Sequence, residues 1–426
     1  MTIEQLYKIF EQYPSVETDT RKLKTGDIFF ALKGENFNGN SFTKKALESG
    51  AVYAVIDDKE FYINDNTILV DDVLKTLQEL AKYHRKQFTI PFLAITGSNG
   101  KTTTKELIHA VLSSTLKTYT TEGNLNNHIG IPLTILRIKK DAHIAVIEMG
   151  ANHQKEIASY CEFTLPTHGL ITNCGKAHLE GFGGVEGVKK GKGELFDYLR
   201  SNNGTAFIMS DYDYLLEMSN GIQKQITYGI SDAEITGVLI SADPFIAVEI
   251  TKGADIAKIQ TRLVGNYNLP NVLAAVAVGK HFNIPEKAIK TSIENYHPSN
   301  SRSQMIEKGT NKIILDAYNA NPSSMKLAIE NFASLNANKK ILVLGAMAEL
   351  GNESIEEHKS IIKLIQQYKW DNVLLVGGDF LKLQHPYLSF SNAEEAKACL
   401  QKLQMENSYF LIKGSRSIKL EKILES

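Results

Sequence analysis

The sequence predicts an α/β protein with three consecutive domains. At 426 residues the chain is longer than one hydrophobic core usually supports, so two or three domains are expected. Short apolar segments of strand length alternate with stretches of helical periodicity, a pattern typical of mostly parallel sheets covered by helices. One apolar strand is followed by a glycine-bounded loop and a helix, which is the arrangement of a phosphate-binding loop.

The first domain is predicted to span residues 1–89. Its predicted elements are strands at 27–32 and 51–56 and helices at 43–49 and 73–86. The last of these helices is amphipathic and closes the unit. Pro91 then separates the first domain from the next strand, because proline interrupts regular structure.

The second domain is predicted to span residues 90–297. Apolar strands at 143–149 and 169–172 alternate with helical patterns, which indicates a mostly parallel sheet. Residues 222–264 change to short segments in which polar and apolar residues alternate. This stretch predicts a small antiparallel insertion.

The third domain is predicted to span residues 298–426, beginning near Pro298. Its continuous apolar strands indicate a second doubly wound, Rossmann-like sheet, whose ligands are expected at the carboxyl ends of the strands. The predicted strands are 312–316, 340–344, 372–376 and 408–412.

Composition excludes some function classes. The formal net charge is −1, so charge gives no reason to expect binding to nucleic acid or to an anionic membrane. We find no signal-peptide pattern at the first residues and no apolar run near the roughly 18 residues of a membrane helix. Cys161, Cys174 and Cys399 are too few and scattered for a disulfide framework. We therefore expect a soluble cytoplasmic protein without a membrane span.

The candidate phosphate loop follows the apolar strand at 92–96. Gly97 and Gly100 allow backbone N–H groups to face one anion, and the next helix directs its positive end at the same point. Lys101 can reach the outer phosphates, and the Thr102 hydroxyl can bind the Mg²⁺ that accompanies ATP. A βα turn that merely contains Gly-Lys-Thr is the alternative. The candidate nucleotide-binding residues here are Gly97, Ser98, Asn99, Gly100, Lys101, Thr102 and Thr103.

Two polar residues follow the neighbouring strands. Glu148 ends one strand, where a carboxylate suits Mg²⁺, although a solvent-exposed acid is the alternative. His178 follows the next strand, where a lone histidine is more often a surface or capping residue. A zinc site formed by His168, Cys174 and His178 is disfavoured, because their spacing fits no paired ligand pattern.

Three further residues have two interpretations each. Lys192 follows Lys189 and Lys190, so it belongs either to a solvated basic face or near a metal, where its amine could be carboxylated by CO₂. Asn268 and Asn271 lie three apart at the start of an apolar helix. They are candidates for helix capping or for recognition of the adenine edge.

Together these segments resemble the Mur ligase family, the ATP-dependent enzymes that assemble the peptidoglycan stem peptide. The loop from Thr96 to Thr102 is similar to that family's variant without a leading glycine, which accounts for Ile95. The resemblance spans nearly the whole chain. Six more residues follow in the family's order and at similar spacing: Glu148, His178, Lys192, Asn271, Arg302 and Asp316.

The resemblance implies a role for each of these residues. The implied catalytic residues are Lys101, Glu148, His178 and Lys192. Two Mg²⁺ ions would be held by Thr102, Glu148, His178 and a carbamylated Lys192. ATP would also be contacted by Asn271 and, after the domains close, by Arg302 and Asp316.

Four segments resemble the branch of the family that joins D-alanyl-D-alanine to UDP-N-acetylmuramoyl-tripeptide: 19–39, 123–132, 316–322 and 413–417. This implies that the first domain binds the UDP-linked substrate and that the third domain contributes to binding ATP and D-alanyl-D-alanine. It also implies a monomer whose partners are small molecules. The implied substrate-binding residues are Thr20, Arg21, Lys33, Gly34, Asn38, Gly39, Asn124, Asn126, Asn127, Tyr318, Asn319 and Asn321.

Two positions depart from the family pattern. Ala346 stands where relatives usually carry aspartate, so no catalytic acid is predicted there, and Gly191 stands where alanine is more usual. Three alternatives remain open: a kinase or simple NTPase with the same phosphate loop, a nucleotide-binding scaffold without chemistry, and a folylpolyglutamate synthase. A kinase or NTPase has no evident need for the asparagine-rich loop at 123–130 or for the third domain. A scaffold would tolerate loss of Glu148 and Lys192, which are present. The last would not be expected to have the segment at 1–88.

Overall fold

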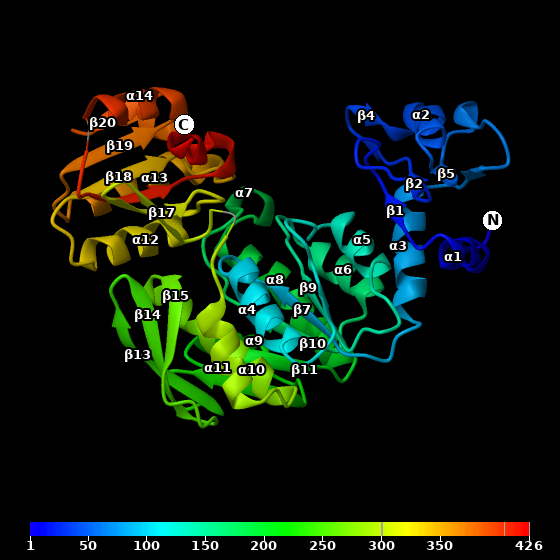
Figure 1. The fold of residues 1–426 in the computed structure, drawn as a ribbon, viewed down its shortest axis with the longest axis horizontal. Helices are drawn as coiled ribbons and strands as arrows, with labels where there is room; N and C mark the ends of the chain where they lie inside the picture. Colours follow the sequence, from blue (N-terminus) through cyan, green and yellow to red (C-terminus); the bar gives the residue numbers. More distant parts are fainter. Residues whose placement is uncertain (300, 404, 426) are drawn as a thin grey trace.

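Three main sheets follow one another along the chain (Figure 1). The computed structural model describes residues 1–299, 301–403 and 405–425. In these residues the sheets have four, nine and six strands. The three-part α/β prediction is confirmed. The domain limits predicted at 89/90 and 297/298 fall between the sheets and stay predictions.

The N-terminal sheet is parallel in the order β1-β2-β5-β6. Its strands are β1 (Val16–Glu17), β2 (Ile28–Phe30), β5 (Tyr53–Ile56) and β6 (Thr67–Leu69). A separate hairpin consists of β3 (Lys33–Gly34) and β4 (Phe37–Asn38), and the helices are α1 (Ile3–Gln12), α2 (Thr43–Glu48) and α3 (Val73–Arg85).

Helix α3 joins this domain to the central one. The Asp72 carboxylate accepts from the N–H of Lys75 and so begins the helix. Val73, Leu77 and Leu80 recur at helical spacing and are buried. The helix packs against α1 and also against α5 and α6 of the central domain.

The central sheet has the strand order β15-β14-β13-β12-β11-β10-β7-β9-β8. Its strands are β7 (Phe92–Thr96), β8 (Thr118–Thr120), β9 (Ile144–Glu148), β10 (His168–Ile171), β11 (Thr205–Met209), β12 (Lys224–Gly229), β13 (Ile235–Ala242), β14 (Phe245–Lys252) and β15 (Ile259–Val264). The helices are α4 (Lys101–Ser113), α5 (Gly130–Leu136), α6 (Glu156–Thr164), α7 (Leu179–Phe182), α8 (Val185–Ser201), α9 (Asp213–Met218), α10 (Leu269–His281) and α11 (Glu286–Asn295).

The stretch predicted as an antiparallel insertion extends this same sheet. β12 is parallel to both β11 and β13, and only β13, β14 and β15 pair antiparallel. Alternating polarity correctly indicated strands with one exposed face. The predicted antiparallel insertion is confirmed in β13, β14 and β15, which continue the central sheet beyond the parallel strand β12.

The C-terminal sheet has the order β16-β17-β21-β18-β19-β20, with β16 antiparallel at one edge. Its strands are β16 (Gln304–Lys308), β17 (Asn311–Asp316), β18 (Lys340–Gly345), β19 (Asn372–Val376), β20 (Leu388–Phe390) and β21 (Tyr409–Lys413). The helices are α12 (Pro322–Ser334), α13 (Ser354–Ile365) and α14 (Ala393–Leu403). The sequence analysis did not predict the two edge strands β16 and β20. Neither strand has a buried residue, so both lack the continuous apolar pattern.

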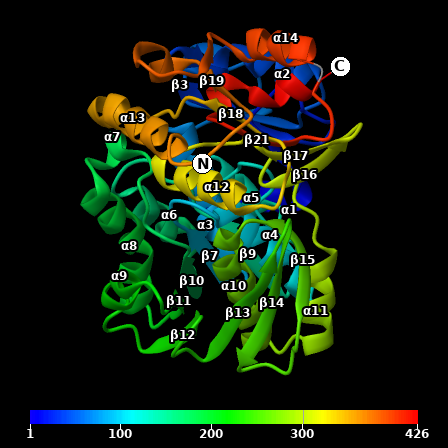
Figure 2. The same cartoon turned by 90° about the vertical axis from the view of Figure 1, so that its left-hand side faces the viewer.

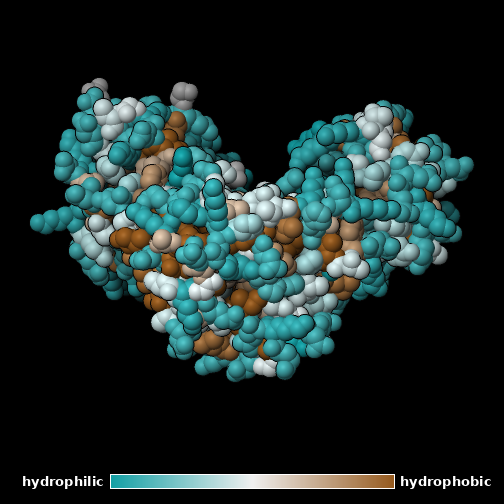
Figure 3. Space-filling view, turned by 60° about the horizontal axis from the view of Figure 1, so that its bottom comes forward, coloured by the Kyte–Doolittle hydropathy of each residue, from teal (hydrophilic) through white to brown (hydrophobic). Residues whose placement is uncertain are grey.

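The two outer domains stand on either side of a hollow above the central domain (Figure 3). Helix α12 lies on the side of the C-terminal domain that faces the central domain (Figures 1 and 2). In the part of the chain that the structure describes, we find no helix with the length and apolar character needed to cross a bilayer.

Candidate functional site

The predicted phosphate loop connects β7 to α4. Gly97 has φ +141°, and a Cβ there would lie 2.0 Å from the Thr172 hydroxyl oxygen. Gly100 has φ +79° and directly precedes the first residue of α4. Both positions therefore require glycine. The exposed N–H groups at the start of α4 face the loop side of the helix, as an anion site requires.

Hydrogen bonds to the segment after β10 hold this loop in shape. The N–H of Ser98 donates to the Asn173 carbonyl (2.8 Å), and the N–H of Asn99 donates to the Asn173 side-chain oxygen (3.1 Å). The Thr172 hydroxyl donates to the carbonyl of Asn99 (2.6 Å). The sequence analysis did not identify Thr172 or Asn173. Their position just after a strand beside β7 was the available signal.

The Lys101 amine is hydrogen-bonded to the backbone of the phosphate loop. Its Nζ donates to the carbonyls of Gly97 (2.6 Å) and Ser98 (3.2 Å). Burial lowers the pKa of this amine to about 8, with Glu148 raising it and Arg302 lowering it. Arg302, a cation of the C-terminal domain, lines the same cavity as Thr102.

Glu148 ends β9, the strand that pairs with β7, and is 1 % exposed. Its Oε1 accepts from the Thr102 hydroxyl (3.2 Å) and from the Asn126 amide (2.8 Å). Its Oε2 is buried and has no hydrogen-bond partner in the described residues. A buried carboxylate oxygen without a donor is unfavourable unless a cation neutralises it. Thr102 and Glu148 together therefore fit a hard divalent cation.

Lys192 lies inside α8 and is 1 % exposed, which contradicts the solvated basic face for this residue. Its Nζ donates to the Ala151 carbonyl (2.8 Å) and lies 4.8 Å from the centre of the Phe182 ring. Burial, and then the positive charge of Lys101, lower the pKa of the Lys192 amine to about 7. A Cβ at Gly191 would lie 2.5 Å from the Phe182 ring, so glycine leaves room for that ring.

His178 contacts the C-terminal domain. Its Nδ1 contacts the carboxylate of Glu349, a residue of the loop in which Ala346 replaces the expected acid. The contact lowers the pKa of the Glu349 carboxyl. The sequence analysis missed Glu349, although an acid three positions after Ala346 was the available signal. In the described residues no group of three or more His, Cys, Asp and Glu side chains could hold a metal ion.

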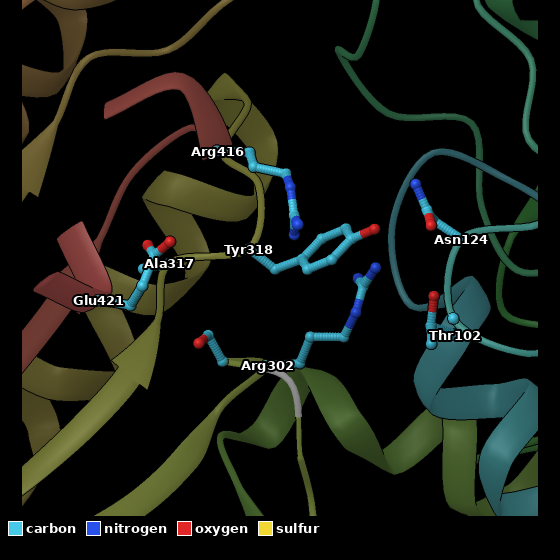
Figure 4. Close-up of a pocket in the computed structure, with 9 residues that line it drawn as sticks. Thr102, Asn124, Arg302, Ala317, Tyr318, Arg416 and Glu421 are labelled. Carbon is cyan, nitrogen blue, oxygen red and sulfur yellow. The ribbon is translucent and has the colours of Figure 1, made fainter. Parts of the chain in front are cut away.

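A cavity of about 230 Å³ lies between the phosphate loop and the C-terminal domain (Figure 4). The Arg302 guanidinium lies 3.6 Å from the centre of the Tyr318 ring. The structure thus brings two residues implied for ATP and substrate next to Thr102 and Asn124. The lining residues are Thr102, Gly123, Asn124, Ser301, Arg302, Ala317, Tyr318, Arg416 and Glu421.

Asp316 is the partner of a buried lysine. Its Oδ2 accepts from Lys413 Nζ (2.5 Å), and its Oδ1 accepts from the N–H of Ser303 (3.2 Å). Lys413 is 2 % exposed, so Asp316 supplies its counter-charge. The sequence analysis assigned Lys413 no role, although it opens one of the four segments of the resemblance.

Three asparagines near the loop have defined contacts. Asn321 caps α12 through its side-chain oxygen, and its amide donates to the Asn99 side chain (2.7 Å). Asn271 accepts from the Thr104 hydroxyl (2.9 Å) and donates to Asn268 (2.8 Å). Neither Asn268 nor Asn271 makes the side-chain cap that was one interpretation of this pair. Asn319 is exposed.

The remaining predicted substrate residues lie apart from the loop, mostly in the N-terminal domain. Arg21 is exposed and pairs with Asp19 through two 2.8 Å hydrogen bonds. Lys33 pairs with Asp57 (2.9 Å), and Asn127 accepts from N–H groups at the start of α5. The others in this separate group are Thr20, Gly34, Asn38 and Gly39.

Comparison with known proteins identifies the family. Three family models match the chain: the Mur ligase family catalytic domain at 12–85, the Mur ligase middle domain at 95–279, and the Mur ligase glutamate ligase domain at 301–416. The UDP-N-acetylmuramoyl-tripeptide–D-alanyl-D-alanine ligase of Bacillus subtilis is 37 % identical, with 96 % of this chain and 92 % of the relative covered. The chain belongs to the Mur ligase family.

Solved structures of Mur ligases share the fold. MurF from Acinetobacter baumannii matches with a TM-score of 0.89 at 28 % identity, covering 99 % of this chain and 97 % of the other. MurF from Thermotoga maritima, solved in complex with ADP, matches with a TM-score of 0.86 at 26 % identity, covering 96 % of each chain. The predicted family is confirmed, and with it an ATP-dependent ligase rather than a kinase or a scaffold.

Proposed function

We propose that this Mur ligase joins D-alanyl-D-alanine to UDP-N-acetylmuramoyl-tripeptide at the expense of ATP, as a cytoplasmic monomer. Similarity over almost the full length to ligases of that name is the observation that carries the proposal. The cavity between Thr102 and Tyr318 supports it, because it lies where a phosphate-binding loop meets a second domain. The folylpolyglutamate synthase alternative is disfavoured by the same full-length similarity.

In the first step a carboxylate of the tripeptide attacks the γ-phosphorus of ATP, and ADP leaves as an acyl phosphate forms. The phosphate loop and the start of α4 bind the triphosphate through N–H groups. Lys101 supplies positive charge beside the transferred phosphoryl group. Arg302 supplies more positive charge from the C-terminal domain. Phosphoryl transfer depends mainly on such positioning and charge neutralisation.

We propose two Mg²⁺ sites that use Thr102, Glu148, His178 and Lys192. Bound Mg²⁺ would neutralise phosphate charge and orient the oxygens of the reacting groups. The buried, partnerless oxygen of Glu148 supports the first site. For the second, His178 must leave Glu349, and Lys192 must carry a carbamate in place of its ammonium.

The environment of Lys192 favours that modification. Only the neutral amine attacks CO₂, and a pKa of about 7 keeps much of the amine neutral near neutral pH. Enzyme equilibrated with ¹³CO₂ should show a carbamate carbon by NMR that Lys192→Met lacks. Lys192→Ala should also lose activity, which a short-chain carboxylic acid should partly restore. An unchanged carbamate signal in Lys192→Met would contradict the assignment.

In the second step the amine of D-alanyl-D-alanine attacks the acyl carbon, and phosphate leaves from the tetrahedral intermediate. An acyl phosphate is hydrolysed by water, so the site must be closed while it exists. Contacts of Asn321 with Asn99 and of Lys176 with Ser323 hold the C-terminal domain against the loop segments. We propose that these contacts close the site.

Phosphate release tests the function. Release should require both the UDP-tripeptide and D-alanyl-D-alanine. Lys101→Ala should reduce turnover by about 10²-fold or more, because the side chain supplies charge while the backbone shapes the loop. Lys190→Ala, at an exposed position of α8, is the matched control and should retain activity. Equal release without the dipeptide would instead identify a simple NTPase.

A further inference from the structure

Lys105 is a buried cation to which the proposed mechanism assigns no role. It lies on α4, about one turn after Lys101, and its side chain is 4 % exposed. Burying an ammonium group costs free energy that a single ion pair seldom returns, so a buried lysine is poor evidence of stabilisation. A positive charge at this place in the helix therefore has a reason other than stability.

The Lys105 amine fixes the backbone at the end of β8. Its Nζ donates to the carbonyl of Thr121 (2.8 Å), the residue that follows the strand. Thr121 is fully buried, and its N–H donates to the carbonyl of Val146 in β9 (3.2 Å). Lys105 thus ties α4 to the point where the chain leaves the central sheet.

Thr121 in turn contacts the proposed metal ligand. Its hydroxyl accepts from the backbone N–H of Glu148 (3.0 Å). The Lys105 amine is therefore linked to the backbone of Glu148 through a single intervening residue. Glu148 carries the buried carboxylate oxygen that has no hydrogen-bond partner in the described residues. The position of that oxygen depends on the backbone that Thr121 holds.

The segment after Thr121 also reaches the site. Asn124 lines the cavity together with Thr102 (Figure 4). Asn126 donates to Glu148 Oε1 (2.8 Å). Glu148 is thus contacted by Thr121 at its backbone and by Asn126 at its carboxylate. Both contacts come from the segment whose first residue accepts from the Lys105 amine.

A counter-charge keeps this amine in place. The carboxylate of Glu106 lies 3.8 Å from Lys105 Nζ and accepts from the Tyr296 hydroxyl (2.5 Å). Tyr296 directly follows α11, before the connection to the C-terminal domain. Burial and the charge of Glu106 raise the pKa of Tyr296, so its hydroxyl remains a donor. Lys105 is therefore held between a fixed acid and a fixed carbonyl.

We propose that Lys105 is a positioning residue, which holds Thr121 and so sets the place of the Glu148 carboxylate in the first Mg²⁺ site. The inference rests on the metal site proposed above and adds to it a residue that does not touch the metal. Removing a partner behind a metal ligand commonly weakens metal binding by about 10- to 100-fold. Lys105 acts through Thr121, so an effect near the lower end of this range is expected.

Manganese binding tests this without relying on turnover. Mn²⁺ is titrated into the protein without nucleotide, and free Mn²⁺ is measured by electron paramagnetic resonance. Lys105→Met keeps much of the side-chain volume but removes the donor, and should raise the Kd for Mn²⁺ by about tenfold. Thr121→Val removes the acceptor of the Glu148 N–H and should do the same. Lys117→Met, whose side chain is 58 % exposed just before β8, is the control and should leave the Kd unchanged.

The double variant distinguishes positioning from independent damage to the fold. If Lys105 acts through Thr121, the two losses overlap, and the double variant should bind Mn²⁺ within about twofold of Lys105→Met. If circular dichroism shows that Lys105→Met is unfolded, Lys105→Gln takes its place. Glutamine is shorter and uncharged, and its variant should show the same overlap with Thr121→Val.

Two kinds of failure are distinguishable. A Lys105 variant with the Kd of the parent, or losses that multiply in the double variant, would overturn the role of Lys105. A parent enzyme that binds no Mn²⁺, or Glu148→Gln binding it as tightly as the parent, would instead overturn the proposed metal site.

Discussion

The N-terminal and C-terminal domains both contact the central domain, but through different kinds of group. At the N-terminal side, α3 packs against α5 and α6, and the buried guanidinium of Arg85 donates to the carbonyls of Phe88, Thr164 and Leu165. His84 is also buried there and bridges the Tyr7 hydroxyl and the carbonyl of Ile138. Arg85 and His84 are almost fully buried, so separating the two domains would break these hydrogen bonds and expose the apolar face of α3.

At the C-terminal side the contacts are polar and partly exposed. Asn321 donates to Asn99, the N–H of Lys176 donates to the Ser323 hydroxyl, and Lys176 forms an ion pair with Glu357 (2.5 Å). Water can replace such partners at little net cost in free energy. We infer that the N-terminal attachment is permanent, whereas the C-terminal one can open and close. Several of these contacts involve the phosphate loop or the segment after β10, and others join Asn266 to Asn331 and Tyr267 to Ser303.

The largest effect is expected at Arg85. Arg85→Met leaves three carbonyls without their donor and removes the guanidinium from the Phe92 ring, 3.7 Å away. The free energy of unfolding should fall by about 3 kcal/mol, as for removal of a buried charged donor. Urea denaturation measures this. Lys86→Met, the exposed neighbour, should change it by less than about 0.5 kcal/mol. Equal effects of the two variants would contradict the permanent attachment.

The next effect is a pH dependence of the same interface. Burial lowers the pKa of His84 below its usual 6.5. The carbonyl of Ile138 can only accept, so Nε2 carries the proton and Nδ1 accepts from Tyr7. As pH falls below 6.5 the unfolded chain binds a proton that the folded chain resists, so stability falls.

Protonation of Nδ1 also breaks the bond from Tyr7, for a total on the order of 1 kcal/mol. The denaturation midpoint of the parent should therefore drop between pH 7 and pH 5 by more than that of His84→Gln. Identical pH profiles of parent and variant would show that His84 is not held neutral by this interface.

A smaller effect is expected at the polar interface. Asn321→Ser keeps an N-cap for α12 but is too short to reach Asn99. Turnover should fall several-fold with little change in thermal stability, because closure loses one contact. Asn321→Ala should lose the same turnover and, in addition, about 1 kcal/mol of stability with the cap. Equal turnover of Asn321→Ser and the parent enzyme would show that closure does not need the contact with Asn99.

The smallest effect belongs to the ion pair between Lys176 and Glu357. The lysine side chain is 48 % exposed, and pairs of this kind contribute from 0 to about 1 kcal/mol. Lys176→Met should therefore change turnover within about twofold, and the difference should shrink as salt is added. We expect the parent enzyme to become more compact in small-angle scattering when ATP and UDP-tripeptide bind, and Lys176→Met should do the same. A complete loss of compaction would make this pair, rather than the loop contact, the main closing element.

The sequence by itself determined the local features. The run from β7 through Gly97 and Gly100 into α4 was predictable, because glycine conformation, strand burial and helix start depend on a few adjacent residues. The position of Glu148 at a strand end was predictable for the same reason. The amphipathic pattern of α3 and the apolar strands of all three sheets likewise follow from short-range periodicity.

Only the tertiary structure decided which distant groups meet. Lys192 lies in a run with two other lysines, yet the ring of Phe182 and the carbonyl of Ala151 bury it, and its low pKa follows from that packing. Lys413 meets Asp316, and Arg416 meets Tyr318, only because β21 lies beside β17 in the sheet. Pairing between strands nearly a hundred positions apart leaves no local pattern, because it depends on the packing of the whole domain rather than on neighbours in the chain.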